Sequence, residues 1–385
     1  MTATGAPATS RLRQLVGFLH HDPANLQLIG EAAAAALDEG ELSQADDLLA
    51  GYARLAPLPP ALSNLAGLVA LSDGRFEAAA VIFQQLLPDN PSDPALRFNL
   101  AWCRAMLKDY AGASAILDEQ AASASPQAAL LKVQMLHHLG ELEAALDWGA
   151  RLVQRFSGDP ALLGALAAVA IDAEDVGLAE RYALGAGENH DALATLGMLR
   201  LNEDSVDDAL KLFNRALGLD PHDPRALLGE GLGLLAKGEL RAAPPLIDQA
   251  AERFEHHLGS WVAAGWAYFV NGDYISSRAR FDKALALDDT FAETHGGLAV
   301  LDAVEGDLAG AKRRTEVALR LDRKCFSAAL AKSLILISEG DPTSAARVRN
   351  IALNAPIGPG GRTIAQALLS LGTATRQARG SPFDR

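Results

Sequence analysis

Histidines and paired carboxylates are the residues of this sequence whose chemistry could support metal binding or catalysis. Three histidine pairs are adjacent in the chain: His20-His21, His137-His138 and His256-His257. Adjacent residues on a helix point about 100° apart, whereas two histidines that share a zinc ion on one helix are spaced i, i+4. Acidic pairs such as Asp46-Asp47 fall on outward helix faces, where solvation accounts for them. We therefore expect no metal ion and no cofactor.

The short motifs of common catalytic sites do not occur in the chain. It contains no GxSxG nucleophile turn, no HExxH zinc motif and no glycine-rich phosphate loop ending in Lys. We therefore expect a protein that is not an enzyme.

The cysteines and the N-terminal stretch indicate the compartment. Cys103 and Cys325 lie far apart in the chain, which suits a reducing environment. The chain begins MTATGAPATSRLRQLVGFLHH, which lacks the apolar core of a secretory signal. No stretch approaches the roughly 20 uninterrupted apolar residues of a membrane-spanning helix. We expect a cytoplasmic protein without membrane insertion, and the Ala-rich composition suggests a bacterial source.

Charge is unevenly distributed. The formal net charge is −14, which argues against electrostatic binding of nucleic acid. Residues 305–385 carry 13 basic and 7 acidic side chains, a net +6, so the first 304 residues carry −20. A solvated outer face accounts for such charge. Head-to-tail association of copies, or a basic C-terminal docking surface, is the alternative.

The stretch Leu258–Phe291 has the pattern of two amphipathic helices joined by a tight turn. Trp261, Gly265 and Tyr268 recur at i, i+4 and i+7, which places them on one helical face. Gly272 follows where a helix end needs left-handed backbone, and Phe281 recurs on the inner face of the second helix. Such a hairpin cannot bury its apolar face alone, so we expect neighbouring copies to cover it.

Copies of this unit run along the chain at spacings of 34, 34, 32, 34, 30, 34, 34, 34 and 34 residues. The turn position reads Gly40, Gly74, Lys108, Gly140, Glu174, Asp204, Gly238, Gly272, Gly306 and Gly340. Five residues later stand Ala45, Ala79, Ala113, Ala145, Ala179, Ala209, Ala243, Ser277, Ala311 and Ala345. Seven residues before each turn stand Ala33, Gly67, Ala101, Val133, Ala167, Gly197, Gly231, Gly265, Ala299 and Ser333.

This register of small residues, aromatics and turns resembles the tetratricopeptide repeat (TPR) family. The resemblance covers residues 24–353 and implies an all-α fold, a right-handed α-solenoid of about ten helix-turn-helix repeats. Around this array we expect a disordered N-terminus (1–10), a capping helix or half-repeat (11–23), a linker (354–362), a C-terminal capping helix (363–379) and a tail (380–385). These flanks leave no room for a fused catalytic domain.

Three repeats depart from the pattern. Gly149 and Ala183, in repeats four and five, stand where better repeats carry Phe, so we expect a change of superhelical pitch over 158–189. In repeat seven, Pro244-Pro245 predicts a second helix that starts late or kinks.

In the TPR family the first helices of successive repeats line a concave groove. The resemblance places these residues on it: Asn64, Leu68 and Leu71; Phe98, Trp102 and Met106; Leu130, Gln134, His137 and His138; Met198 and Leu201; Arg225, Leu228 and Leu232; Val262, Trp266 and Phe269. Family members that hold a C-terminal carboxylate use Lys, Arg and Asn here. In this chain only Asn64 and Arg225 would suit a carboxylate, and the other positions are mostly apolar.

An apolar groove of this kind predicts a non-catalytic scaffold, adaptor or chaperone that binds an amphipathic or extended segment of another protein. Aromatic anchors dominate protein interfaces, and Phe98, Trp102 and Met106 form the strongest candidate cluster. The alternatives are a structural protein that self-associates and a regulatory subunit of an enzyme complex. The same side chains could equally be covered by the protein itself.

Overall fold

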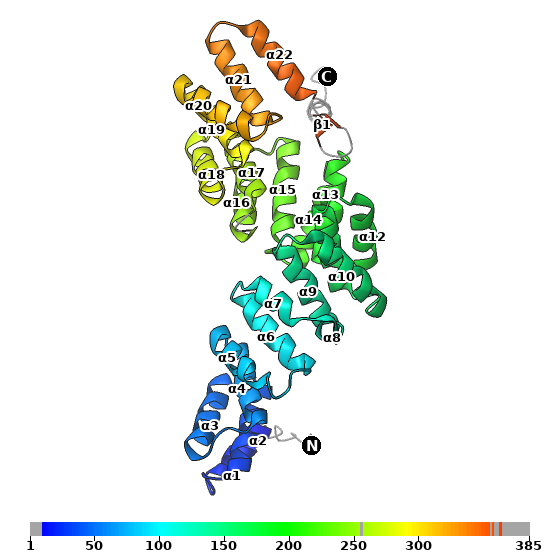
Figure 1. The fold of residues 1–385 in the computed structure, drawn as a ribbon, viewed down its shortest axis with the longest axis vertical. Helices are drawn as coiled ribbons and strands as arrows, with labels where there is room; N and C mark the ends of the chain where they lie inside the picture. The colour runs from blue at the N-terminus through cyan, green and yellow to red at the C-terminus, as the bar shows by residue number, and fades with distance from the viewer. Residues whose placement is uncertain (1–9, 255–256, 355, 358–361, 364–385) are drawn as a thin grey trace, which may run out of the picture. The chain divides into compact units, whose positions relative to one another are not determined.

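The computed structural model describes residues 10–254, 257–354, 356–357 and 362–363 (Figure 1). In this part of the chain 22 helices follow one another, and all but one belong to ten helical hairpins. The first helices are α2 (Leu26–Asp38), α4 (Pro60–Ser72), α6 (Pro94–Met106), α9 (Pro126–His138), α11 (Pro160–Asp172), α13 (His190–Asn202), α15 (Pro224–Lys237), α17 (Leu258–Val270), α19 (Ala292–Glu305) and α21 (Phe326–Ser338). The second helices are α3 (Leu42–Leu55), α5 (Phe76–Leu86), α7 (Tyr110–Ile116) with α8 (Glu119–Ala122), α10 (Leu142–Arg155), α12 (Val176–Ala186), α14 (Val206–Leu219), α16 (Ala243–Phe254), α18 (Tyr274–Leu287), α20 (Leu308–Leu321) and α22 (Pro342–Leu353). The all-α solenoid of helical hairpins predicted from the sequence is confirmed.

The chain divides into two compact units. Unit 1 runs to Val169 and unit 2 begins at Ala170, so the boundary falls within α11. This boundary lies inside the stretch 158–189 that the sequence marks as irregular. The pitch change expected there stays a prediction.

The turn register is visible in the backbone. All ten turn positions have positive φ, including three that are not glycine: Lys108 at 62°, Glu174 at 60° and Asp204 at 63°. A side chain in this left-handed region costs roughly 1–2 kcal/mol. The geometry of the hairpin therefore holds even where the residue type opposes it.

Aromatic rings fill the wedge between consecutive hairpins. Phe83, Phe213 and Phe281 are fully buried, each on the second helix of its repeat. A Cβ atom at Gly197 would lie 2.5 Å from the Phe213 ring, and one at Gly229 would lie 2.2 Å from it. The ring of Phe213 is thus held between two first helices that must lack side chains at the contact.

The second helix of repeat three is broken, which accounts for the 32-residue spacing that follows. After α7, Asp118 N–H donates to Ile116 O rather than to Ser114 O. The buried Lys132 of α9 fills the vacated position: its Nζ lies 2.8 Å from Ser114 O, 3.0 Å from Ser114 Oγ and 4.8 Å from the centre of the Trp148 ring. Burial lowers the pKa of Lys132. A polar contact thus replaces the helical hydrogen bond at the break.

Repeats four and seven compensate for their unusual residues. The fully buried Leu166 occupies the space beside Gly149, where a Cβ atom would lie 2.1 Å from Leu166 Cδ2. In repeat seven α16 begins at Ala243, five residues after Gly238, so that Pro244 and Pro245 fall in its first turn. The second helix of repeat seven thus starts late, as Pro244 and Pro245 predict.

The two ends of the array carry different elements. Helix α1 (Arg11–Leu19) buries Leu12 and Leu15 against α2, and Ser10 caps its N-terminus although residues 1–10 were expected to be disordered. At the other end, β1 (Pro356–Ile357) pairs antiparallel with β2 (Arg362–Thr363). Residues 1–9, the remainder of the expected C-terminal helix and the tail lie outside the described residues.

Candidate partner-binding surfaces

A hollow in unit 1 brings together predicted groove residues from three consecutive repeats. Its volume is about 380 Å³. Its lining includes Leu71 of α4, Phe98 and Trp102 of α6, and Leu130 and Gln134 of α9. These five residues define what we call the unit 1 groove. They meet because the same face of each first helix points inward in every repeat.

Aromatic surface is exposed in the unit 1 groove. The rings of Phe98 and Trp102 lie with centroids 6.0 Å apart and planes tilted by 40°. The Trp102 side chain is 37% exposed, and Met106, one turn further along α6, is 43% exposed. Asn99 and Gln127 add amide groups to the lining. The groove thus offers apolar surface with hydrogen-bonding groups beside it.

The other predicted residues of unit 1 do not belong to the lining of this hollow. Leu68 packs against the cluster around Phe83. The Oδ1 atom of the half-buried Asn64 accepts no hydrogen bond from a described residue. His137 is half-buried, and its neighbour His138 stacks on Tyr110 with centroids 4.5 Å apart.

In unit 2 the predicted groove residues are mostly covered by the protein itself. Leu228 and Val262 are each only 9% exposed and belong to core clusters, so we leave them out of the partner-binding surface. Trp266 makes edge-to-face contacts with Phe269 at 5.3 Å and with Phe281 at 5.6 Å. These contacts within the protein explain the position of Trp266 without a binding partner.

The remaining aliphatic groove positions of unit 2 are also packed. Met198 and Leu201 pack against the cluster around Phe213, and Leu232 packs against the cluster around Ile247. Sequence position alone therefore does not distinguish these side chains from those of the unit 1 groove.

Arg225 already holds a carboxylate, that of Asp172. The two side chains form a bidentate pair, with Nη1–Oδ1 at 2.9 Å and Nη2–Oδ2 at 2.8 Å. The pair joins α15 to the end of α11 across 53 residues of sequence. Its partner could not be identified from the sequence, because no local spacing connects the two residues.

A second polar contact that the sequence did not reveal joins α13 to α15. His190 Nδ1 lies 2.7 Å from Asp223 Oδ2 and 3.7 Å from Asp191 Oδ1. Ligand atoms of these three residues lie within 4.8 Å of one another, a grouping that could hold a metal ion. However, Asp223 Oδ1 also accepts the N–H of Ala226. An ion pair combined with a helix cap therefore accounts for the geometry.

The contact between His190 and Asp223 predicts a pH dependence of stability. The hydrogen bond to Asp223 raises the pKa of His190 to about 9, above its unfolded value of about 6.5. The stabilisation is therefore complete below about pH 6.5 and is lost as the pH rises through about 9. Because the side chain is 37% exposed, we expect a discounted effect of about 1–2 kcal/mol.

The measurement is the difference in the free energy of unfolding between the wild type and His190→Gln, from pH 6 to pH 10. It should shrink over that range. A difference that stays constant with pH would rule out the ion pair.

Comparison with known proteins agrees with this architecture. Two family models described as tetratricopeptide repeat match the chain, one at residues 70–134 and the other at 31–94, 114–160, 194–257 and 228–290. The second alone covers more than half of the sequence.

One curated protein and several solved structures are similar to the chain. Cellulose synthase 2 operon protein C of Komagataeibacter xylinus is 29% identical over 169 residues, which are 40% of this chain and 13% of that protein. A monomeric mutant of IFIT1 with Gppp-AAAA has 13% identity and a TM-score of 0.50, over 89% of this chain and 95% of that one. A human IFIT1 dimer with PPP-AAAA has 14% identity and a TM-score of 0.49, over 91% and 96%. Identities this low show the fold alone.

No described helix is both long and apolar enough to cross a membrane. The family matches, the ten hairpins and the left-handed turns agree throughout. This chain belongs to the tetratricopeptide repeat family.

Proposed function

We propose that the protein is a non-catalytic scaffold that holds an apolar segment of another protein in the unit 1 groove. The observation that carries the proposal is the meeting of Leu71, Phe98, Trp102, Leu130 and Gln134 around one hollow with Trp102 partly exposed. The tetratricopeptide repeat is a protein-interaction architecture, which supports a protein as the partner.

The chemistry of the groove favours an apolar segment over an acidic tail. A C-terminal carboxylate is held best by cationic donors that converge on it. No cationic side chain belongs to the lining of this hollow, where Phe98 and Trp102 offer aromatic surface instead. Aromatic side chains that are partly desolvated before binding act as anchors at interfaces. An amphipathic helix or an extended apolar strand would bury both rings, while Asn99 and Gln127 could bond its backbone.

Within this function we favour an adaptor or chaperone in a bacterial cytoplasm. Cys103 and Cys325 are both free and buried, which supports a reducing compartment. Burial raises the pKa of Cys103 to about 11, so its thiol stays protonated and unreactive at neutral pH.

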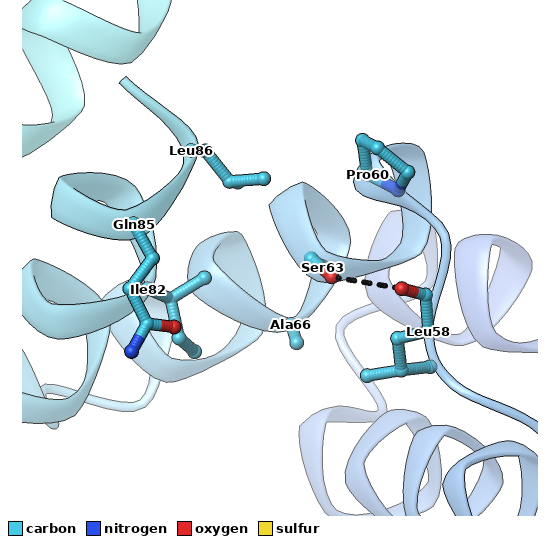
Figure 2. Close-up of a pocket in the computed structure, with 7 residues that line it drawn as sticks. All are labelled: Leu58, Pro60, Ser63, Ala66, Ile82, Gln85 and Leu86. Carbon is cyan, nitrogen blue, oxygen red and sulfur yellow. Dashed lines mark hydrogen bonds between the residues drawn. The ribbon is translucent and has the colours of Figure 1, made fainter. Parts of the chain in front are cut away.

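The experiment is site-specific photo-crosslinking in the native extract. A photo-crosslinking amino acid placed at Gln134 lies in the groove, whereas one placed at Gln85 lies in a different hollow of unit 1 (Figure 2). We expect Gln134 to yield one protein, joined through an apolar segment that mass spectrometry identifies. Gln85 should not yield it.

The Trp102→Ala variant tests whether the groove is responsible. Loss of a central aromatic anchor should weaken capture at Gln134 by at least about tenfold, with helical content unchanged because Trp102 is partly exposed. Equal capture at Gln85 and Gln134 would refute the proposal. Capture of a second copy of this chain alone would favour self-association instead.

A further inference from the structure

The last repeat has a hollow where repeat eight has a tryptophan. The position compared lies four residues before the small residue of the first helix. In repeat eight this position is Trp261, four residues before Gly265. In repeat ten it is Ala329, four residues before Ser333. Trp261 is 8% exposed and belongs to the same core cluster as Phe281. In repeat ten the short Ala329 side chain leaves a hollow of about 440 Å³.

The lining of this hollow is apolar and comes from three helices. Leu319 of α20, Ala329 of α21, and Val348 and Ala352 of α22 form it. Cys325 also contributes and caps α21, with Sγ 3.4 Å from the backbone N of Ala328. Burial raises the pKa of the Cys325 thiol to about 12, so it adds no negative charge to the hollow at neutral pH.

Three cations border the same hollow. Arg323, Lys324 and Lys332 are all part of its lining, and all are exposed. None forms an ion pair within the described chain, whereas the neighbouring Lys312 pairs with Glu339. The hollow thus combines a neutral apolar interior with a rim of three cations that form no ion pair with a described residue.

We propose that this hollow binds a free amphipathic anion, a carboxylate carried on an aliphatic chain. The chain would lie against the apolar lining, as in small-molecule sites of roughly 300–1,000 Å³. The carboxylate would lie among the cations, which present more donors than one head group can use. The site lies in unit 2 and is independent of the function proposed for the unit 1 groove.

The chain contains a matched hollow without the charges. In repeat two Ser63 stands four residues before Gly67, and Ile82, Gln85 and Leu86 occupy the register positions of Val348, Ile351 and Ala352. This hollow has a volume of about 390 Å³ (Figure 2). No charged side chain belongs to its lining. Without cations to hold a carboxylate, it should bind decanoate too weakly to add a second saturable site.

The test is calorimetric titration of the full chain with decanoate below its micellar concentration. We expect one saturable site per chain, and decanol or decylammonium should bind more weakly. Lys332→Gln and Arg323→Gln should each weaken decanoate binding about fivefold, the size of one exposed ion pair. Added salt should weaken binding in the same sense.

Filling variants separate this hollow from the rest of the surface. Ala329→Trp should abolish binding, and Trp261 at the equivalent position shows that the repeat accommodates that ring. Ala329→Leu is a milder filling variant and should weaken binding. Ser63→Trp in the uncharged hollow and Trp102→Ala in the unit 1 groove should leave decanoate affinity unchanged.

Three results would overturn the proposal. They are decanol binding as tightly as decanoate, affinity that persists in a folded Ala329→Trp chain, and binding only to vesicles that contain anionic lipid. The last result would assign the cations to a membrane surface.

Discussion

Replacing Phe213 with Ala should lower the free energy of unfolding by about 3–5 kcal/mol. The ring is fully buried between Gly197 and Gly229, which have no side chains that could move into the cavity. Because each repeat contacts only its neighbours, the loss weakens the junction between repeats six and seven directly. Urea titration followed by circular dichroism measures the change.

The control is Phe18→Ala, the same chemical change at a ring that is 59% exposed on α1. It should shift the free energy of unfolding by less than about 0.5 kcal/mol. Equal losses for the two variants would mean that the wedge between hairpins does not hold the array together.

Replacing Gly149 with Phe should destabilise the protein by about 1–3 kcal/mol or more, although Phe occupies this register position in three other repeats. Even a Cβ atom there would lie 2.1 Å from Leu166 Cδ2, and Leu166 is fully buried. In the other repeats a Phe ring fills this space, whereas beside Gly149 it is filled by Leu166 of α11. Thermal unfolding of the variant measures the cost.

The double variant Gly149→Phe with Leu166→Ala tests this exchange of volume. Leu166→Ala alone should cost about 2–5 kcal/mol, and the two changes together should cost at least about 1 kcal/mol less than the sum of their separate effects. Strictly additive costs would show that the two side chains do not share one space.

The repeat register predicted the backbone well because turn geometry is local. Lys108, Glu174 and Asp204 were placed at turns by spacing alone, and all three adopt the left-handed backbone that the hairpin requires. The break between α7 and α8 was not predicted. The contact that accompanies the break joins Lys132 to Ser114, which lie 18 residues apart on different helices.

The candidate site was predictable in unit 1 and less so in unit 2. The groove positions of the TPR family identify the helix face that points inward. Trp102 and Trp266 occupy the same groove position in their repeats. They differ because Phe281 and Phe269 contact Trp266 edge to face, whereas Trp102 keeps 37% of its surface exposed. Whether neighbours cover a side chain depends on packing, which a position rule does not contain.

The hollow beside Arg323 and Lys332 could not be predicted from the sequence for a different reason. The sequence showed an excess of basic residues in the last repeats, but net charge gives no location. The structure adds that Ala329 is short where Trp261 is large, and that the cations surround the resulting space. The small side chain of Ala329 is what indicates a binding site, and this is recognised only when the equivalent positions of different repeats are compared.

The contact of Lys132 with the broken helix fixes the order of the modules in this chain. The Lys132 residue is only 7% exposed, and its ammonium group finds a backbone acceptor because α7 ends early and frees Ser114 O. Placed after a repeat whose second helix is continuous, the same lysine would lose that acceptor, at a cost of several kcal/mol. Hairpins three and four are therefore a matched pair that shuffling would separate.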